Sequence, residues 1–194
     1  MGNLRATFIS VVVAALAGPA LAECPTASNL ASGIRVVFAD RSEIYRTGDQ
    51  GVVTYESQDE KGISFGGQLV QGLFPLSGGS NDLSDVNWSR DYGQSVTSIP
   101  RPRPEQTLLA DFLTSSAWVT DAPGRERYDM GPLLVTIVGD CDLATFGVTV
   151  SESEQGSTRK LLYFADLGFA VSIRSFGSDG VASNDAPLRI EAVR

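Results

Sequence analysis

Two segments in the second half of the chain alternate strictly between apolar residues and small or polar ones. The apolar positions are Phe146, Val148 and Val150 in the first segment and Phe169, Val171 and Ile173 in the second. Successive side chains of a β-strand point to opposite faces, so this period of two predicts half-buried strands. We therefore predict that residues 133–175 form the middle of an antiparallel sheet, with both apolar sets facing one core. The same stretch holds the longest apolar run of the mature chain, residues 133–138.

The rest of the mature chain consists of short strand-like units separated by tight turns. About eleven strands and at most one helix are expected, in an up-and-down meander. Short strands with one apolar face must close into a barrel or stack as two sheets. We predict an all-β antiparallel fold, a barrel or open half-barrel, with a sandwich as the second choice. Residues 107–118 combine helical spacing with β-favouring residues, and we predict a strand there.

One long stretch, residues 77–106, lacks any period. It begins with serine and glycine and ends in the stiff sequence Pro-Arg-Pro-Arg-Pro at 100–104. If it were a linker, the segment before it would be too short to hold more than a marginal core. We therefore predict one β domain over residues 23–194 that carries a long loop at 77–106.

The N-terminus has the pattern of a secretory signal peptide. Arg5 is followed by an apolar segment at 8–16 and by Ala20-Leu21-Ala22, which predicts cleavage after Ala22. Residues 1–22 would then be the signal peptide, and the mature chain would be periplasmic or secreted. No later apolar run reaches the roughly 20 residues of a transmembrane helix.

The only two cysteines are Cys24 and Cys141. In an oxidising compartment two cysteines predict one disulfide. Residues 21–24 also resemble the lipobox of bacterial lipoproteins, in which the cysteine is acylated. Glu23 stands where that motif has a small residue, so the disulfide is the preferred interpretation.

Charge and composition argue against several functions. The chain has 23 acidic and 15 basic residues and a net charge of −8, which disfavours nucleic acid and anionic membranes as partners. It has no histidine, so neither a Ser-His-Asp triad nor a His-containing zinc site can form. No cofactor or metal is expected. Carboxylates remain as the candidates for catalysis.

The predicted loop carries the candidate contact residues. Trp88 and Tyr92 are aromatic residues without a core of their own in the loop, and Arg90, Arg101 and Arg103 make it locally basic. These five residues could contact an anionic ligand or a partner at the mouth of a cavity. The alternative is that the two aromatic residues pack back on the sheet and that the prolines and arginines form a solvated spacer.

Residues 161–171 contain a tyrosine, a short turn, a leucine–glycine pair and a strand. This outline resembles an element near the end of β-rich periplasmic half-barrel proteins of proteobacteria, which include lipoprotein carriers and related secreted families. The resemblance implies a curved sheet whose concave face holds an acyl chain or a partner segment. It assigns no functional residue.

Three functional hypotheses follow. The preferred one is a non-enzymatic periplasmic binding or envelope-assembly protein, whose partner would be an apolar small molecule, a lipid or an envelope protein. The second is a structural or interaction domain of the cell envelope. The third is a carboxylate-dependent hydrolase, which would need two carboxylates roughly 5–10 Å apart in a cleft.

Overall fold

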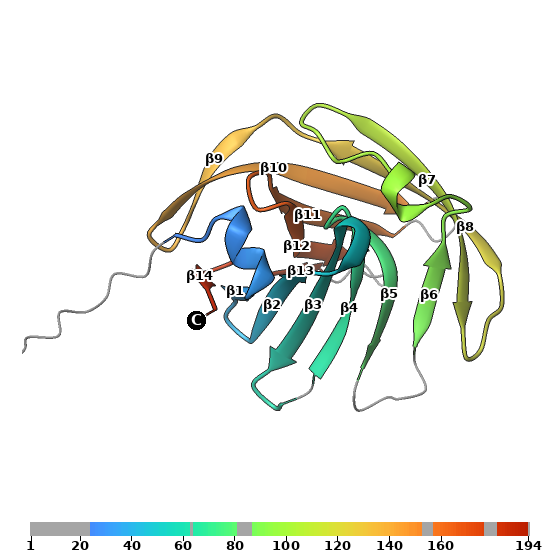
Figure 1. The fold of residues 1–194 in the computed structure, drawn as a ribbon, viewed down its shortest axis with the longest axis horizontal. Coiled ribbons are helices and arrows are strands. Elements are labelled where there is room, and N and C mark those ends of the chain that lie inside the picture. Colours follow the sequence, from blue (N-terminus) through green and yellow to red (C-terminus); the bar gives the residue numbers. More distant parts are fainter. Residues whose placement is uncertain (1–23, 63, 81–86, 153–156, 177–181, 194) are drawn as a thin grey trace, which may run out of the picture.

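The computed structural model describes residues 24–62, 64–80, 87–152, 157–176 and 182–193, and the predicted signal peptide lies outside them. The described chain forms one antiparallel sheet and three short 3₁₀ helices (Figure 1). The helices are η1 Ala27–Ala31, η2 Asp49–Gly51 and η3 Val96–Ser98. The strands are β1 Ile34–Val37, β2 Arg41–Thr47, β3 Val52–Asp59, β4 Ser64–Val70, β5 Phe74–Ser80, β6 Trp88–Asp91, β7 Thr107–Ser116, β8 Ala122–Met130, β9 Leu134–Val138, β10 Cys141–Glu152, β11 Thr158–Phe164, β12 Phe169–Phe176, β13 Ala182–Asn184 and β14 Arg189–Ala192. The predicted all-β antiparallel fold is confirmed, with more strands than the eleven expected, and the segment 107–118 is mostly strand β7.

The sheet is a long meander that curls but stays open. Its order is β13-β12-β11-β10-β8-β7-β6-β5-β4-β3-β2-β1-β14, and β9 pairs only with β10. The two end strands, β13 and β14, are consecutive in the chain, so residues 182–192 connect one end of the sheet to the other. Figure 1 shows β11 to β13 inside the curve formed by the other strands. The sheet is not closed into a barrel. It therefore corresponds to the open one of the two predicted forms, a barrel or an open half-barrel.

The apolar run 133–138 is not in the middle of the sheet, contrary to the prediction. Strand β9 covers it and has one partner, β10, with Leu134 opposite Thr145 and Val138 opposite Cys141. Val135 and Ile137 are 72% and 71% exposed, and Leu133 and Leu134 are also exposed. Only Val138 at its end is buried. β9 pairs with the first part of β10 and β8 with the last part, and no described strand pairs with the outer edge of β9.

The prediction that the two alternating segments face one core is wrong, because each segment faces a different core. Phe146 on β10 pairs with Tyr163 on β11, and Tyr163 pairs with Ala170 on β12, so these three residues share a face. Phe169 and Val171 lie on the opposite face of the same strands, with Phe164. One core lies between this second face and β1–β3, and the other lies between the first face and β5, β8 and η3. β11 and β12 are therefore buried on both sides where the sheet curls around them, whereas Gly147 on the second face of β10 is exposed.

Aromatic contacts connect the middle strands to the strands around them. Tyr45 of β2 stacks on Phe169 with ring centroids 4.2 Å apart. On the other face, Phe146 and Tyr163 stack at 4.9 Å. Such pairs add roughly 0.5–1.5 kcal/mol to the free energy gained by burial alone.

One end of the curl is closed by a contact between two turns. The amide of Ala170 donates to the carbonyl of Gly72 at 2.9 Å, and the Tyr163 hydroxyl donates to the carbonyl of Gln71 at 3.1 Å. Gly72 has a φ of +64°, and a Cβ there would overlap the backbone of Gly168. Glycine is therefore required where the β4–β5 turn meets the β11–β12 turn.

The prediction that residues 77–106 form one long loop is wrong, because strands lie inside this segment. Strand β5 continues to Ser80, and residues 88–91 form β6, which pairs with both β5 and β7. Helix η3 follows at Val96–Ser98, with Ile99 buried after it. Four residues of strand inside a polar segment carry too little period-two signal to be recognised in the sequence.

The predicted disulfide is present between Cys24 and Cys141, with Cα atoms 5.5 Å apart. It joins the described N-terminal end of the chain, just before η1, to the first residue of β10 across 117 positions. Cys141 belongs to the same core as Leu30 of η1 and Ile34 of β1.

The exposed and buried apolar strands differ in what they tolerate. Val148→Asp and Val171→Asp each place an unpaired charge at a site that is 1% exposed and should cost roughly 4 kcal/mol or more, enough to prevent folding. Ile137→Asp should leave the melting temperature within a few degrees, because that side chain is in water. Thermal unfolding followed by circular dichroism measures all three. An equally damaging Ile137→Asp would mean that β9 is covered.

Removal of the disulfide should strongly destabilise the protein. Closing a loop of this length is expected to contribute about 4–5 kcal/mol, an upper figure. Cys141→Ala should therefore lower the melting temperature by many degrees and leave Cys24 titratable with a thiol reagent. Cys24→Ala should match it closely, because both lose the same cross-link. Unchanged melting in both variants would contradict the prediction.

Candidate functional site

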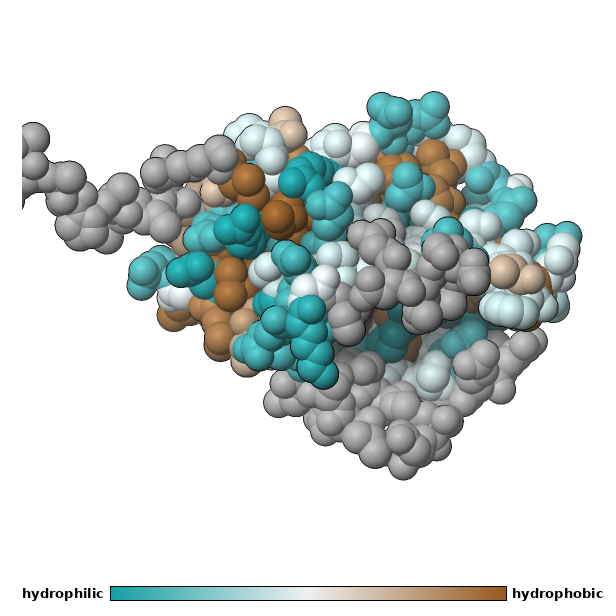
Figure 2. All heavy atoms as spheres, turned by 90° about the horizontal axis from the view of Figure 1, so that it is seen from below, coloured by the Kyte–Doolittle hydropathy of each residue, from teal (hydrophilic) through white to brown (hydrophobic). Residues whose placement is uncertain are grey.

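A cavity of about 200 Å³ lies inside the curl of the sheet, between β2–β4, β5–β6 and the β11–β12 hairpin. Its lining includes Glu43, Tyr45, Tyr55, Phe65, Leu69, Trp88, Arg90, Arg159, Leu161 and Ser172. Figure 2 views the molecule from the end where β3 turns into β4, and shows a hollow with both hydrophilic and hydrophobic atoms on its walls. The curvature of the sheet thus brings residues from distant parts of the chain to one site.

Aromatic rings form one wall of the cavity. Tyr45 and Tyr55 are directly opposite each other on β2 and β3 and stack at 5.9 Å. Tyr55 also makes an edge contact with Phe65 at 5.7 Å. Gly67 is opposite Tyr55 on β4, and a Cβ there would lie 2.9 Å from the Tyr55 ring. The glycine therefore leaves room for the ring that lines the cavity.

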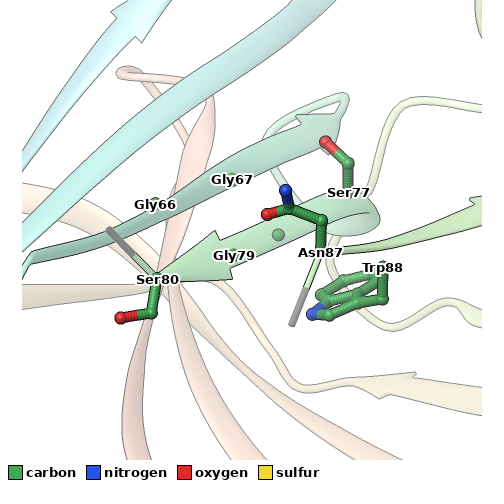
Figure 3. A pocket seen from close by; sticks show the side chains of 8 residues that line it. Gly66, Gly67, Ser77, Gly79, Ser80, Asn87 and Trp88 are labelled. Carbon is green, nitrogen blue, oxygen red and sulfur yellow. The ribbon is translucent and has the colours of Figure 1, made fainter. Parts of the chain in front are cut away.

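Glycines on β4 and β5 also form an open groove of about 500 Å³ that shares Trp88 with the cavity (Figure 3). Gly78 pairs with Trp88, and a Cβ on Gly78 would lie 2.8 Å from the indole. The pairing of β4 with β5 shifts register between Gln68 and Leu69. This irregularity directly follows the Gly66-Gly67 pair, and glycine in a strand often accompanies a bulge.

Glu126 on β8 is the most deeply buried charge of the site, with 1% of its side chain exposed. One oxygen accepts from Arg90 Nη1 at 2.9 Å and from the Tyr128 hydroxyl, and the other accepts from Arg159 Nη2 at 2.5 Å. Arg90 also stacks on Phe112, with its Cζ 3.9 Å from the ring centroid. A carboxylate buried this deeply is stable only because all these donors replace water.

A second buried carboxylate, Glu43, lies on the opposite wall. It accepts from Arg41 Nε at 2.8 Å and from the Tyr45 hydroxyl at 2.6 Å. Arg41 also pairs with Asp185 at 3.2 Å, which connects β2 to the residue after β13. This cluster therefore joins β2 to the segment that follows the end strand β13.

Burial changes the pKa values of the site residues. Burial and then the Glu43 charge raise the pKa of Tyr55 to about 12 and that of Tyr45 well above its usual range. Burial would lower the pKa of Arg90, but pairing with Glu126 outweighs it and the pKa is raised. All these groups therefore keep their ordinary charge at neutral pH.

The five residues singled out in the predicted loop separate into three groups. Trp88 and Arg90 line the cavity. Tyr92 packs on Phe74 and Phe112 and donates its hydroxyl to the carbonyl of Pro75 at 2.7 Å, so it is a packing residue. Arg101 and Arg103 are exposed and do not line the cavity; Arg101 donates to the carbonyl of Ala165 at 3.4 Å.

Sequence reasoning missed Glu43, Glu126 and Arg159. A signal for two of them exists in the alternation: Glu126 shares a strand face with Tyr128 and Met130, and Glu43 shares one with Tyr45. A glutamate in phase with buried residues needs a cationic partner. For Glu43 that partner is Arg41, two positions away. For Glu126 the sequence does not show which arginine it is, because its partners are 36 and 33 positions away.

Two features are absent from the part of the chain that the structure describes. No cluster of three or more histidine, cysteine, aspartate or glutamate residues there could hold a metal ion. No helix there has the length and apolar character needed to cross a membrane.

The tyrosines give a pH test of this packing. The pKa of each of the five is raised, so each holds its proton more tightly in the folded state. Their contribution to stability should be complete below pH 10 and be lost as the pH rises towards 12, the pKa of Tyr55 and Tyr92. Ultraviolet titration should show no tyrosinate near pH 10 in the native protein, whereas the urea-unfolded chain titrates there. Tyrosines that ionise near pH 10 while the circular dichroism stays native would contradict the burial.

Comparison of the chain with protein-family models, curated proteins and solved structures found no match. The cavity combines aromatic and aliphatic walls with two arginines and the carboxylate of Glu43.

Proposed function

We propose that the chain is a non-enzymatic binding protein that holds a small, largely apolar ligand inside the curl of its sheet. Ligand sites are concave, mostly apolar, and carry a few polar groups that fix orientation. The cavity between β2–β4 and β11–β12 has this character, with Tyr55, Leu69, Trp88 and Leu161 as apolar surface and arginines at one side. That combination is the observation that carries the proposal.

The size of the cavity favours a small ligand. Drug-sized molecules occupy pockets of roughly 300–1,000 Å³, and this cavity is about 200 Å³. The contact between the β4–β5 and β11–β12 turns limits its depth. A medium-length chain or a single ring system fits this space better than a long acyl chain.

A hydrolase gains less support from the same residues. The two buried carboxylates, Glu43 and Glu126, each accept hydrogen bonds from an arginine and a tyrosine. These contacts occupy both carboxylates, and Glu126 does not line the cavity, whereas a general acid must reach the atom that it protonates.

An interaction domain is the second candidate function, and β9 favours it. This strand exposes Leu134, Val135 and Ile137 and has one neighbour, β10. Natural sheets usually protect such an edge with charges, prolines or a covering segment.

We place this function in the periplasm or outside the cell. The predicted signal peptide at 1–22 directs secretion. The Cys24–Cys141 disulfide fits an oxidising compartment.

Filling the cavity tests the proposal. Ser172 lines the cavity, so Ser172→Phe should occupy it without unfolding the protein. Trp118 is 80% exposed, and in a Trp118→Phe background Trp88 is the remaining tryptophan and reports on the cavity by fluorescence. Octanoate and octan-1-ol serve as probes, and at least one should give a saturable change that Ser172→Phe abolishes.

The matched control is Ser89→Phe, which adds the same side chain at an exposed position of β6. It should bind like the parent. If neither probe gives a saturable change in the parent, or if Ser172→Phe binds as well as Ser89→Phe, the cavity is not a ligand site.

A further inference from the structure

The cavity wall carries more positive than negative charge at one side. Arg90 and Arg159 both line the cavity, whereas Glu126, the carboxylate that they share, does not and lies behind them. Two guanidinium groups against one carboxylate leave 2 − 1 = +1 at this side. Tyr128 adds no charge, because burial and then Glu126 raise its pKa well above the usual value.

The two arginines also have hydrogen-bond donors to spare. A guanidinium group has five N–H donors. Arg90 gives one to Glu126, and its Nε is buried with no acceptor among the described residues. Arg159 gives Nη2 to Glu126 and keeps 36% of its side chain exposed. Arg159 is therefore the arginine whose remaining N–H donors a ligand in the cavity can reach.

The negative charge on the opposite wall does not neutralise them. Glu43 is held by Arg41 and the Tyr45 hydroxyl, and no ion pair within 4.0 Å joins it to Arg90 or Arg159 in the described structure. Glu43, Tyr55 and the two arginines line the same cavity. An anion is therefore favoured at the arginine side and disfavoured at the Glu43 side, which orients it.

We propose that the ligand is an amphipathic monoanion, such as a carboxylic acid with a medium-length apolar body. Its anionic group binds Arg159 and Arg90, and its apolar body contacts Tyr55, Leu69 and Trp88. This inference rests on the proposed binding function and names the chemical class that the site selects. Arginine is suited to the task because its planar fork binds a carboxylate with two parallel hydrogen bonds.

The test compares two probes that differ only in their polar group. In the Trp118→Phe background, octanoate should bind at least about tenfold more tightly than octan-1-ol, the ratio expected for a charge-assisted hydrogen bond. Fluorescence measures this ratio in the Trp118→Phe protein. Isothermal titration calorimetry measures the same two affinities in the protein without any substitution, so the comparison does not depend on a variant.

Arg159→Gln should remove most of the preference for octanoate and leave the affinity for octan-1-ol nearly unchanged. Arg127→Gln is the matched control, because it removes the same charge from an exposed arginine on the outer face of β8. Octanoate should also bind more weakly as salt increases.

Two failures can be told apart. Equal binding of the two probes, both abolished by Ser172→Phe, would overturn the anion selectivity and leave the binding function standing. Absence of saturable binding of either probe would overturn both. Loss of octanoate affinity in Arg127→Gln as large as in Arg159→Gln would show that overall charge, not this site, selects the anion.

Discussion

The structure depends on a curled sheet in which the strands β11 and β12 are apolar on both faces. β10, β11 and β12 place Phe146, Tyr163 and Ala170 on one face and Phe164 and Phe169 on the other. A sheet with two apolar faces must be covered on both sides, as in parallel sheets between helices. This chain has no long helix among its described residues, so its own sheet supplies both covers by curling. The cavity is the part of that interior which side chains leave unfilled.

The polar groups of the interior follow from the same curl. β2, β6, β8 and β11 each bring one charged residue inward: Glu43, Arg90, Glu126 and Arg159. Taken alone, any of them would destabilise the fold, because desolvation of a charge costs more than most single contacts return. Taken together, they hold β6, β8 and β11 in register around one carboxylate. The glycines on β4 and β5 contribute differently, by leaving room for the rings of Tyr55 and Trp88.

The candidate site was only partly within reach of sequence reasoning. Trp88 and Arg90 were singled out because an aromatic residue and an arginine in a polar segment suggest contact with something outside that segment, and both line the cavity. Tyr92 was singled out for the same reason and proves to pack against Phe74 and Phe112. Local composition does not separate these outcomes, because they depend on which way β6 and the residue after it face in the sheet.

The sequence by itself determined the all-β class, the strands with a clear period of two, and the disulfide partners. These depend on near neighbours along the chain, or on there being only two cysteines to pair. Tertiary structure alone decided that most of the run 133–138 is exposed, that 146–150 and 169–173 serve two cores, and that Arg159 joins Arg90 at Glu126. The physical reason is that a period of two specifies two faces without saying what covers either of them. Burial and charge pairing are set when strands distant in sequence come together, and a curling sheet makes that choice differently at each point along its length.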